Sequence, residues 1–246
     1  MPPDIPILQH AAPRELVQSL RQEIARLEGS RRPASGEAVS SGCGPLDKLL
    51  PRQGFQRGTL VEWLVAGEGS GGESLAFLAA REACREGGAL VVFDQAREFY
   101  PPAAIRLGIG TAGMIVVQAA SQADNLWALD QALRCPGVAA ALAWPEKLDG
   151  RTFRRLQLAA EQGGGLGFLV RPERVRGEPS WADVRLAVEP LPATGPHAPR
   201  RLAIELLHSR GGANGKRVEM EIDDETHSLY LASPLADPAT RRAAGA

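Results

Sequence analysis

Short apolar runs alternate with helical patterns through the middle of the chain. The runs are rich in Val, Leu, Ile and Ala and read as strands that are buried on both faces. Between them, apolar residues recur at spacings of three and four, which predicts helices. The predicted strands are residues 60–65, 89–94, 114–118, 138–143 and 166–170, and the predicted helices are residues 74–86, 121–134 and 151–162. This alternation indicates an α/β fold with a parallel sheet covered on both faces.

The rhythm changes in the last third of the chain. Apolar segments now follow one another without a helix, which predicts an antiparallel extension of the sheet. These segments are residues 185–189, 202–207, 217–222 and 228–231. Four prolines between residues 190 and 199 predict an irregular, exposed connection. We therefore expect one core domain over residues 41–232 and a flexible tail over residues 233–246.

The first forty residues form a separate arm. Between residues 15 and 27 the apolar residues recur at helical spacing, and polar residues occupy the opposite side, so an amphipathic helix is predicted. The polar Gly/Pro-containing stretch 29–36 then reads as a linker. The apolar stripe has to be covered, either by the chain's own core or by a partner chain, including a second copy. The candidate partner-binding residues are Leu16, Leu20, Ile24 and Leu27.

Composition places few further limits on function. With 246 residues, 44% of them hydrophobic, and a formal net charge of -1, the chain can bury one core and lacks a strongly basic character. It contains no run of 18 apolar residues and no secretory pattern at its start, so a cytoplasmic protein without a membrane span is expected. The histidines and cysteines show no metal-ligand spacing, so no metal is expected.

A glycine loop follows the first predicted strand. Its layout, a strand, then residues 66–71, then a helix, is that of a phosphate-binding loop of the GxxxxGK[ST] type. Such a loop needs a lysine for the β- and γ-phosphates and a hydroxyl for Mg²⁺. Those places hold Gly72 and Glu73, and Ala66 replaces the opening glycine. We interpret Gly67, Gly69, Gly71 and Gly72 as a relic of a phosphate loop and expect no nucleotide cofactor.

Several stretches in order resemble the RecA-type core. The stretch 41–47 (SGCGPLD), followed by 54–62 (GFQRGTLVE), is similar to the RecA segment that leads into the first core strand. The stretches 91–94 (VVFD) and 101–108 (PPAAIRLG) are similar to the second strand and the segment after it. The resemblance covers residues 15–231. It implies a three-layer RecA-like core with a mostly parallel sheet and an N-terminal helical arm.

The resemblance also shows which catalytic groups of the family are replaced. The glutamate that activates water in RecA falls at about Ala96, and the acidic residue that supports Mg²⁺ falls at about Trp144. Glu98 and Glu146 lie two residues further on in each case, where a shift in register would place one of them. No shift restores the missing lysine. The chain is therefore expected to be a degenerate ATPase core, with residual ATPase activity as the alternative.

Within the RecA-like group, the chain resembles the ImuA family of accessory proteins. The resemblance is carried by residues 103–108 (AAIRLG), 153–161 (FRRLQLAAE) and 167–172 (GFLVRP). It implies a scaffold role in the DNA-damage (SOS) response, in error-prone translesion synthesis beside an ImuB-like relative of Y-family polymerases, with RecA as a further partner. The chain resembles SulA-type proteins more loosely, which leaves a cell-division inhibitor as another alternative.

Arginines cluster after the strand predicted at residues 166–170. In a RecA-like sheet this loop leaves the carboxyl edge, where guanidinium groups could neutralise phosphates and an indole could stack on a base. Acidic residues dilute the cluster, so a solvated loop and a contact to DNA or a partner both remain open. The candidate contact residues are Arg171, Arg174, Arg176 and Trp181.

Overall fold

The computed structural model describes residues 38–67, 69–110, 113–192, 199–212, 214–223 and 228–231. By its internal contacts the chain divides into two units, Met1–Arg32 and Pro33–Ala246, and every described residue belongs to the second. The predicted N-terminal helix and the predicted tail lie outside the described residues.

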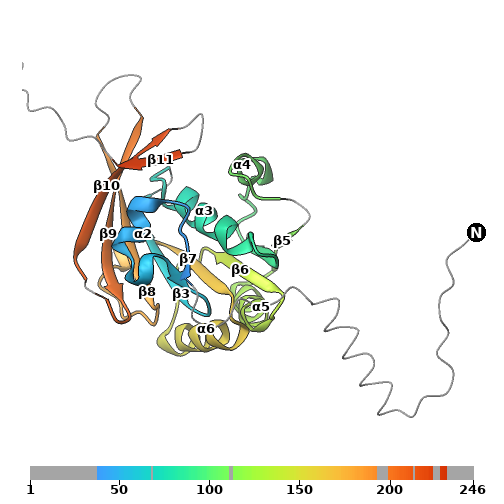
Figure 1. Ribbon diagram of the computed structural model, residues 1–246. Coiled ribbons are helices and arrows are strands. Elements are labelled where there is room, and N and C mark those ends of the chain that lie inside the picture. Colours follow the sequence, from blue (N-terminus) through green and yellow to red (C-terminus); the bar gives the residue numbers. More distant parts are fainter. Residues whose placement is uncertain are drawn as a thin grey trace, which may run out of the picture. The chain divides into compact units, whose positions relative to one another are not determined.

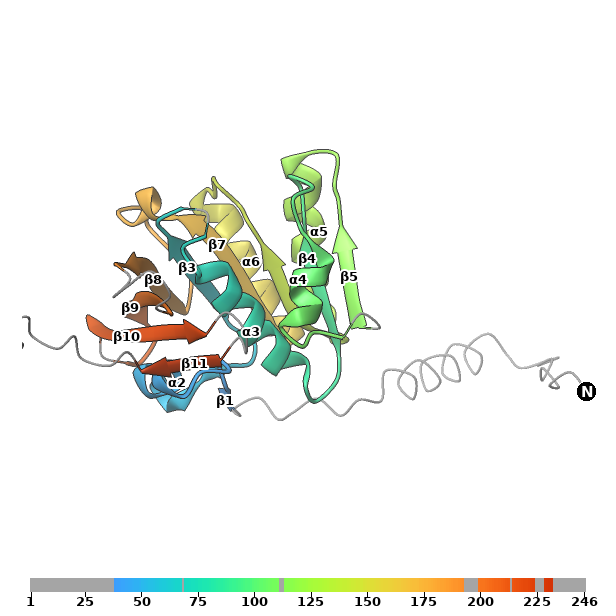
Figure 2. The same cartoon turned by 90° about the horizontal axis from the view of Figure 1, so that it is seen from above.

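A nine-stranded sheet runs through the described part of the chain, in the order β11-β10-β9-β8-β3-β7-β6-β4-β5 (Figure 1). Figure 2 shows β5 and β11 at opposite ends of this sheet. The strands are β3 (Leu60–Val65), β4 (Ala89–Phe93), β5 (Met114–Val117), β6 (Val138–Ala143), β7 (Leu166–Pro172), β8 (Val184–Leu191), β9 (Arg200–Ser209), β10 (Lys216–Asp223) and β11 (Ser228–Leu231). Two short strands, β1 (Ala38–Val39) and β2 (Phe55–Gln56), pair with each other in a separate ribbon.

The direction of β8 corrects the sequence interpretation. This strand was expected to begin the antiparallel extension, but it pairs in parallel with β3 on one side and antiparallel with β9 on the other. The loop after β7 therefore returns the chain to the amino edge of the sheet before β8 begins. Pro190 was expected in an irregular connection and instead lies inside β8, opposite Leu202. The antiparallel extension consists of β9, β10 and β11.

Helices cover both faces of the sheet, which makes the three layers predicted from the pattern. One face packs against α2 (Gly44–Leu49), α3 (Gly72–Cys84) and α4 (Pro101–Arg106), and the other against α5 (Gln122–Arg134) and α6 (Gly150–Gly163). Trp63 and Phe168 belong to the core on the α3 face, and Leu60 and Leu169 belong to the core on the α5 and α6 face. Successive side chains of a strand point to opposite faces of the sheet, so neighbouring residues of β7 belong to different cores.

Local signals explain where α5 and α6 start. Ser121 accepts a hydrogen bond from the Asp124 N–H at 3.1 Å, and Asp149 accepts one from the Thr152 N–H at 2.9 Å, so both helices begin with a side-chain cap. The short helices α2 and α4 were not predicted. Each carries proline in its first turn, where the missing N–H costs nothing. Of the helices that the structure describes, none combines the length and apolar character needed to cross a membrane.

Candidate functional site

The glycine loop lies where a phosphate loop lies, between a strand and a helix. It joins the carboxyl end of β3 to the start of α3, and Gly69 and Gly71 have left-handed φ angles of 72° and 87°. The Ser70 N–H donates to the Gly67 carbonyl at 3.3 Å, and the Ser70 side chain is buried. A positive φ is strained for residues with a side chain, so glycine at these two positions preserves the turn.

The volume in which a phosphate-binding lysine would start is already filled. A Cβ atom added at Gly72 would lie 2.4 Å from Val65 Cγ1, and one added at Gly71 would lie 2.6 Å from Leu202 Cδ2. Val65 precedes the loop, and Leu202 comes from β9 of the antiparallel extension. A lysine at position 72 thus requires Val65 to move, and the sequence of the loop supplies no cation of its own. The residues present do not fit a Mg²⁺-nucleotide complex.

A direct hydrogen bond joins the two positions at which RecA-type proteins hold Mg²⁺. Glu73, in the place of the metal-binding hydroxyl, accepts a hydrogen bond from Trp144 Nε1 at 3.0 Å, and Trp144 directly follows β6. The Trp144 ring lies 6.2 Å from the Phe77 ring, which stacks on Phe99 at 5.5 Å. Aromatic side chains and one glutamate therefore connect α3 to the end of β6.

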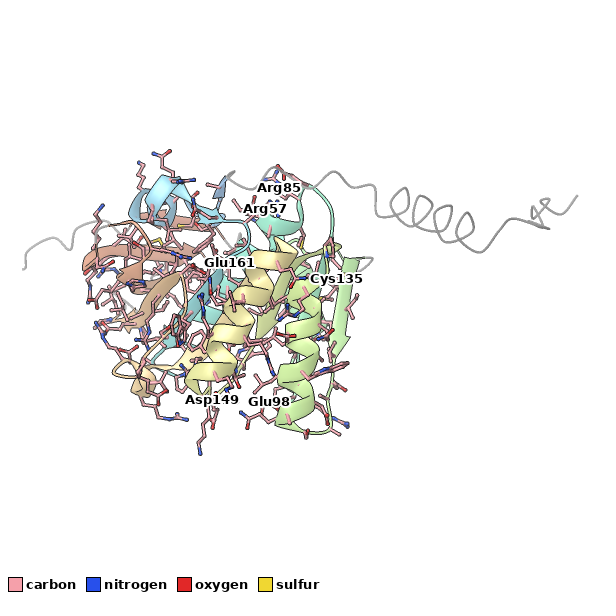
Figure 3. All side chains as sticks on the ribbon, turned by 90° about the horizontal axis from the view of Figure 1, so that it is seen from below. Arg57, Arg85, Glu98, Cys135, Asp149 and Glu161 are labelled. Atoms are coloured by element: carbon pink, nitrogen blue, oxygen red, sulfur yellow. The ribbon has the colours of Figure 1, made fainter. Side chains whose placement is uncertain are left out.

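The segment after β4 is organised by Asp94 rather than by a catalytic base. Asp94 is buried, and its Oδ1 accepts hydrogen bonds from the backbone N–H groups of Glu98 at 2.9 Å and Phe99 at 3.2 Å. Its Oδ2 accepts one from Gln118 Nε2 at 3.0 Å, which ties the segment to the end of β5. Ala96 lies inside this turn and has no side chain that could activate water. Figure 3 marks the carboxyl edge of the sheet by Glu98 and Asp149.

Arg171 lies inside the molecule and is not presented to solvent. Its Nη1 pairs with Glu62 Oε1 at 2.7 Å, and both side chains are 0% exposed. Its other nitrogens donate to the carbonyls of Pro145 at 3.2 Å and Glu146 at 3.3 Å. A buried guanidinium with these partners cannot reach DNA phosphates, so the surface contact expected of Arg171 from the sequence does not hold.

The other three candidate contact residues do lie at the surface. Arg174 is 65% exposed and lies 3.4 Å from a Glu146 carboxylate oxygen, while Arg176 is 40% exposed and pairs with Glu173 and Glu205. Trp181 is 48% exposed, and the guanidinium carbon of Arg154 lies 4.9 Å from its ring centre. We call Arg154, Arg174, Arg176 and Trp181 the edge surface.

At the opposite, amino edge of the sheet, Arg210 is paired within its own chain. Its Nη1 lies 3.2 Å from Glu161 Oε1 and 3.3 Å from Asp183 Oδ1, and these three residues line an open pocket of about 530 Å³. Burial raises the pKa of the Asp183 carboxyl. Hydrogen bonds from Gln157 and Arg210 lower the pKa of Glu161. Arg57 and Arg85 mark this edge in Figure 3.

Sequence reasoning missed the partners that hold these segments. Glu62 is a carboxylate in the middle of a buried strand, and such a residue is expected to meet a buried cation. The sequence therefore contained a signal for a buried partner of Glu62. It contained no signal for the pairing of Glu73 with Trp144, because the two residues lie far apart in the sequence. In the described ranges, His, Cys, Asp and Glu side chains form no group of three or more that could hold a metal ion.

Comparison with known proteins gives two kinds of likeness. Over 171 residues the chain is 34% identical to Protein ImuA of Caulobacter vibrioides, which covers 62% of this chain and 69% of that protein. Over 81 residues it is 33% identical to the cell division inhibitor SulA of Photorhabdus laumondii, covering 33% of this chain and 46% of SulA. No family model matches the chain.

The fold is similar to that of a solved recombinase. The crystal structure of the RadB recombinase superimposes with a TM-score of 0.62, at 16% sequence identity, over 79% of this chain and 100% of RadB. At this identity the likeness concerns the fold alone. It confirms the RecA-like core predicted from the order of motifs.

Proposed function

The chain belongs to the ImuA family of RecA-related proteins, and from this premise we propose that it is a non-catalytic accessory protein of the DNA-damage (SOS) response. It takes part in damage-induced mutagenesis. Its role there is that of a scaffold, which supports error-prone translesion synthesis through contacts to other proteins and through weak contacts to DNA.

The hydrogen bond between Glu73 and Trp144 is the observation that best supports a role without catalysis. Phosphoryl transfer depends almost entirely on positioning and on charge neutralisation by a lysine and Mg²⁺. Here a carboxylate and an indole occupy the two metal-holding positions, 3.0 Å apart. A triphosphate near Glu73 would meet a negative charge with no loop cation to offset it.

Partner binding distinguishes this function from the others. We propose an ImuB-like polymerase relative as the main partner, with RecA as a second. The test is co-purification of the purified chain with an ImuB-like protein, with RecA, and with a cell-division protein as comparison. Retention of the ImuB-like protein supports the scaffold role, and retention of the division protein alone contradicts it.

A SulA-like role in cell division is the second candidate, and the local identity to SulA favours it. That match spans a third of the chain, whereas the match to ImuA spans nearly two thirds. A residual RecA-type ATPase is a third candidate, which the altered loop disfavours. In the co-purification experiment, a SulA-like protein binds the division protein and leaves the ImuB-like protein in the flow-through.

Deleting residues 1–30 should leave a folded core and abolish partner binding or self-association. The sequence pattern places the apolar stripe of Leu16, Leu20, Ile24 and Leu27 on one side of a helix joined to the core by a polar linker. Circular dichroism and analytical ultracentrifugation, beside the co-purification assay, measure the two properties separately. A deletion variant that unfolds would show that the stripe packs on the chain's own core.

Replacing Arg174, Arg176 and Trp181 together with alanine should weaken any binding to single-stranded DNA and flatten its dependence on salt. Each lost phosphate contact lowers the slope of log affinity against log salt by about 0.7 for single strands. Stability should change only modestly, because exposed arginines contribute little to it and the contact of Arg154 with Trp181 is worth about 0.5–1 kcal/mol at an exposed site. Arg217, which is 44% exposed on β10, provides a control when replaced with alanine. If the starting protein binds no DNA at low salt, direct DNA contact is excluded.

A further inference from the structure

A cluster of charged side chains lies buried between the central strands and the loop after β7. Glu62, in the middle of β3, is fully buried. Its Oε1 lies 2.7 Å from Arg171 Nη1, and its Oε2 lies 2.8 Å from Arg185 Nε. The Arg185 contact is an ion pair without the alignment of a hydrogen bond. Ser180 Oγ donates to Glu62 Oε2 at 2.7 Å, so a loop residue joins the same carboxylate.

The remaining donors of Arg185 point at the backbone of that loop. Its Nη2 donates to the Val175 carbonyl at 2.8 Å, and its Nη1 donates to the carbonyls of Arg176 at 2.8 Å and Glu178 at 3.2 Å. One side chain at the start of β8 therefore holds three backbone carbonyl groups within residues 175–178. A planar guanidinium with donors in a fixed fork fixes the direction of each of these carbonyls.

Arg171 anchors the same loop from the other side. Its Nη2 lies 3.0 Å from a Glu178 carboxylate oxygen and 3.3 Å from the Glu146 carbonyl. Glu146 follows β6, and Glu178 belongs to the loop after β7. The two arginines thus connect β7 and β8 to the loop after β6 and to the loop after β7, which carries both Arg174 and Trp181.

The energetics favour a positioning role over a purely stabilising one. Burying an ion pair costs desolvation that its attraction barely offsets, and apolar residues of similar size often stabilise a core as well or better. What apolar residues cannot do is bind six loop acceptors in defined directions. The cluster meets that requirement with hydrogen bonds that end on loop backbone and on Glu178.

We propose that Glu62, Arg171 and Arg185 are positioning residues that hold residues 173–182 in the one conformation that forms the edge surface. Trp181 lies against Arg154 of α6 because the loop that carries it is fastened at Ser180 and at residues 175–178. The use of that surface for binding rests on the proposed function, while the positioning itself does not.

Arg185→Met is the variant that tests the proposal. It removes the three backbone hydrogen bonds, whereas Glu62 keeps Arg171 as its partner at 2.7 Å, so the core stays paired. Trypsin cleaves after Arg174 and Arg176, and mass spectrometry maps the sites. When opening is fast compared with cleavage, the rate follows the population of the open loop. Three lost hydrogen bonds should raise that population about tenfold or more.

Arg201→Met is the matched control. Arg201 is another buried arginine, paired with Glu219 and Glu221 on the antiparallel extension and remote from the loop in sequence. The Arg201→Met variant should be cleaved after Arg174 and Arg176 at the rate of the starting protein. The variants are compared at temperatures equally far below their melting temperatures. Arg185→Lys keeps the charge next to Glu62 but lacks the fork, so it should restore cleavage resistance only in part.

Faster cleavage confined to Arg174 and Arg176 in the Arg185→Met variant supports the proposal. Unchanged cleavage there, cleavage accelerated equally at every site, or full rescue by lysine overturns it. Binding to DNA and to the ImuB-like protein is measured on the same samples. A loop that opens locally while the starting protein binds neither ligand refutes the proposed role of the edge surface and leaves the positioning intact.

Discussion

Replacing Glu62 with glutamine is expected to lower the free energy of unfolding by about 3–5 kcal/mol, the cost of breaking a buried ion pair by removing one partner. The change preserves shape but removes the only negative charge that faces both Arg171 and Arg185 at less than 3 Å among the described residues. Within the described ranges, Arg171, whose side chain is 0% exposed, would keep only the half-exposed Glu178 as an ion-pair partner. Urea denaturation followed by circular dichroism measures the loss.

Glu189→Gln is the control for removing a carboxylate charge at an exposed position. Glu189 lies on β8 as a surface residue, 42% exposed, and pairs with Arg217 at 3.3 Å. Exposed pairs of this kind contribute about 0–1 kcal/mol, so the control should unfold almost as the starting protein does. Equal losses in both variants would mean that the buried cluster does not behave as a buried charge network.

Replacing Gly163 with alanine is expected to destabilise the core by about 3 kcal/mol or more, because overpacking of this kind forces the backbone to shift. Gly163 is the last residue of α6, and an added Cβ would lie 1.6 Å from the Leu133 carbonyl oxygen of α5. The C-terminal ends of the two helices approach so closely there that only glycine fits. Since the obstacle is backbone, no side-chain rotation relieves it.

Gly177→Ala separates this steric effect from the general effect of replacing glycine. An added Cβ at Gly177 meets nothing within 4 Å. Its melting temperature should stay within a few degrees of the starting protein, as for a surface substitution of at most about 0.5 kcal/mol. Differential scanning calorimetry of both variants gives the comparison, and a Gly163→Ala protein as stable as the control would contradict the close approach of the two helix ends.

The parallel strands and long helices could be predicted because each follows a strong local pattern. The segment 60–65 is an unbroken apolar run apart from one glutamate, and β3 has the same bounds. The direction of β8 could not be predicted in this way. A strand's apolar pattern indicates which faces of the strand are buried, but it does not indicate whether the neighbouring strand is parallel or antiparallel.

The candidate site, too, could be predicted only in part. The absence of the phosphate-binding lysine and hydroxyl can be read from the sequence at Gly72 and Glu73. What replaced them depends on contacts between distant segments, as in the bond from Trp144 to Glu73. Arg171 was placed in the loop at the carboxyl edge because the apolar run of the predicted strand ends at Val170. It is buried because β7 continues through Pro172 and brings this side chain next to Glu62.

Titration of Mg²⁺-ATP into the full chain by isothermal calorimetry tests the central claim most directly, with an active RecA-type ATPase as the positive control. The claim is that the RecA-like core has exchanged its nucleotide site for an internal contact. We expect no binding tighter than the millimolar range, which corresponds to about 4 kcal/mol, and no turnover in a parallel phosphate-release assay. Micromolar binding of Mg²⁺-ATP would contradict the account.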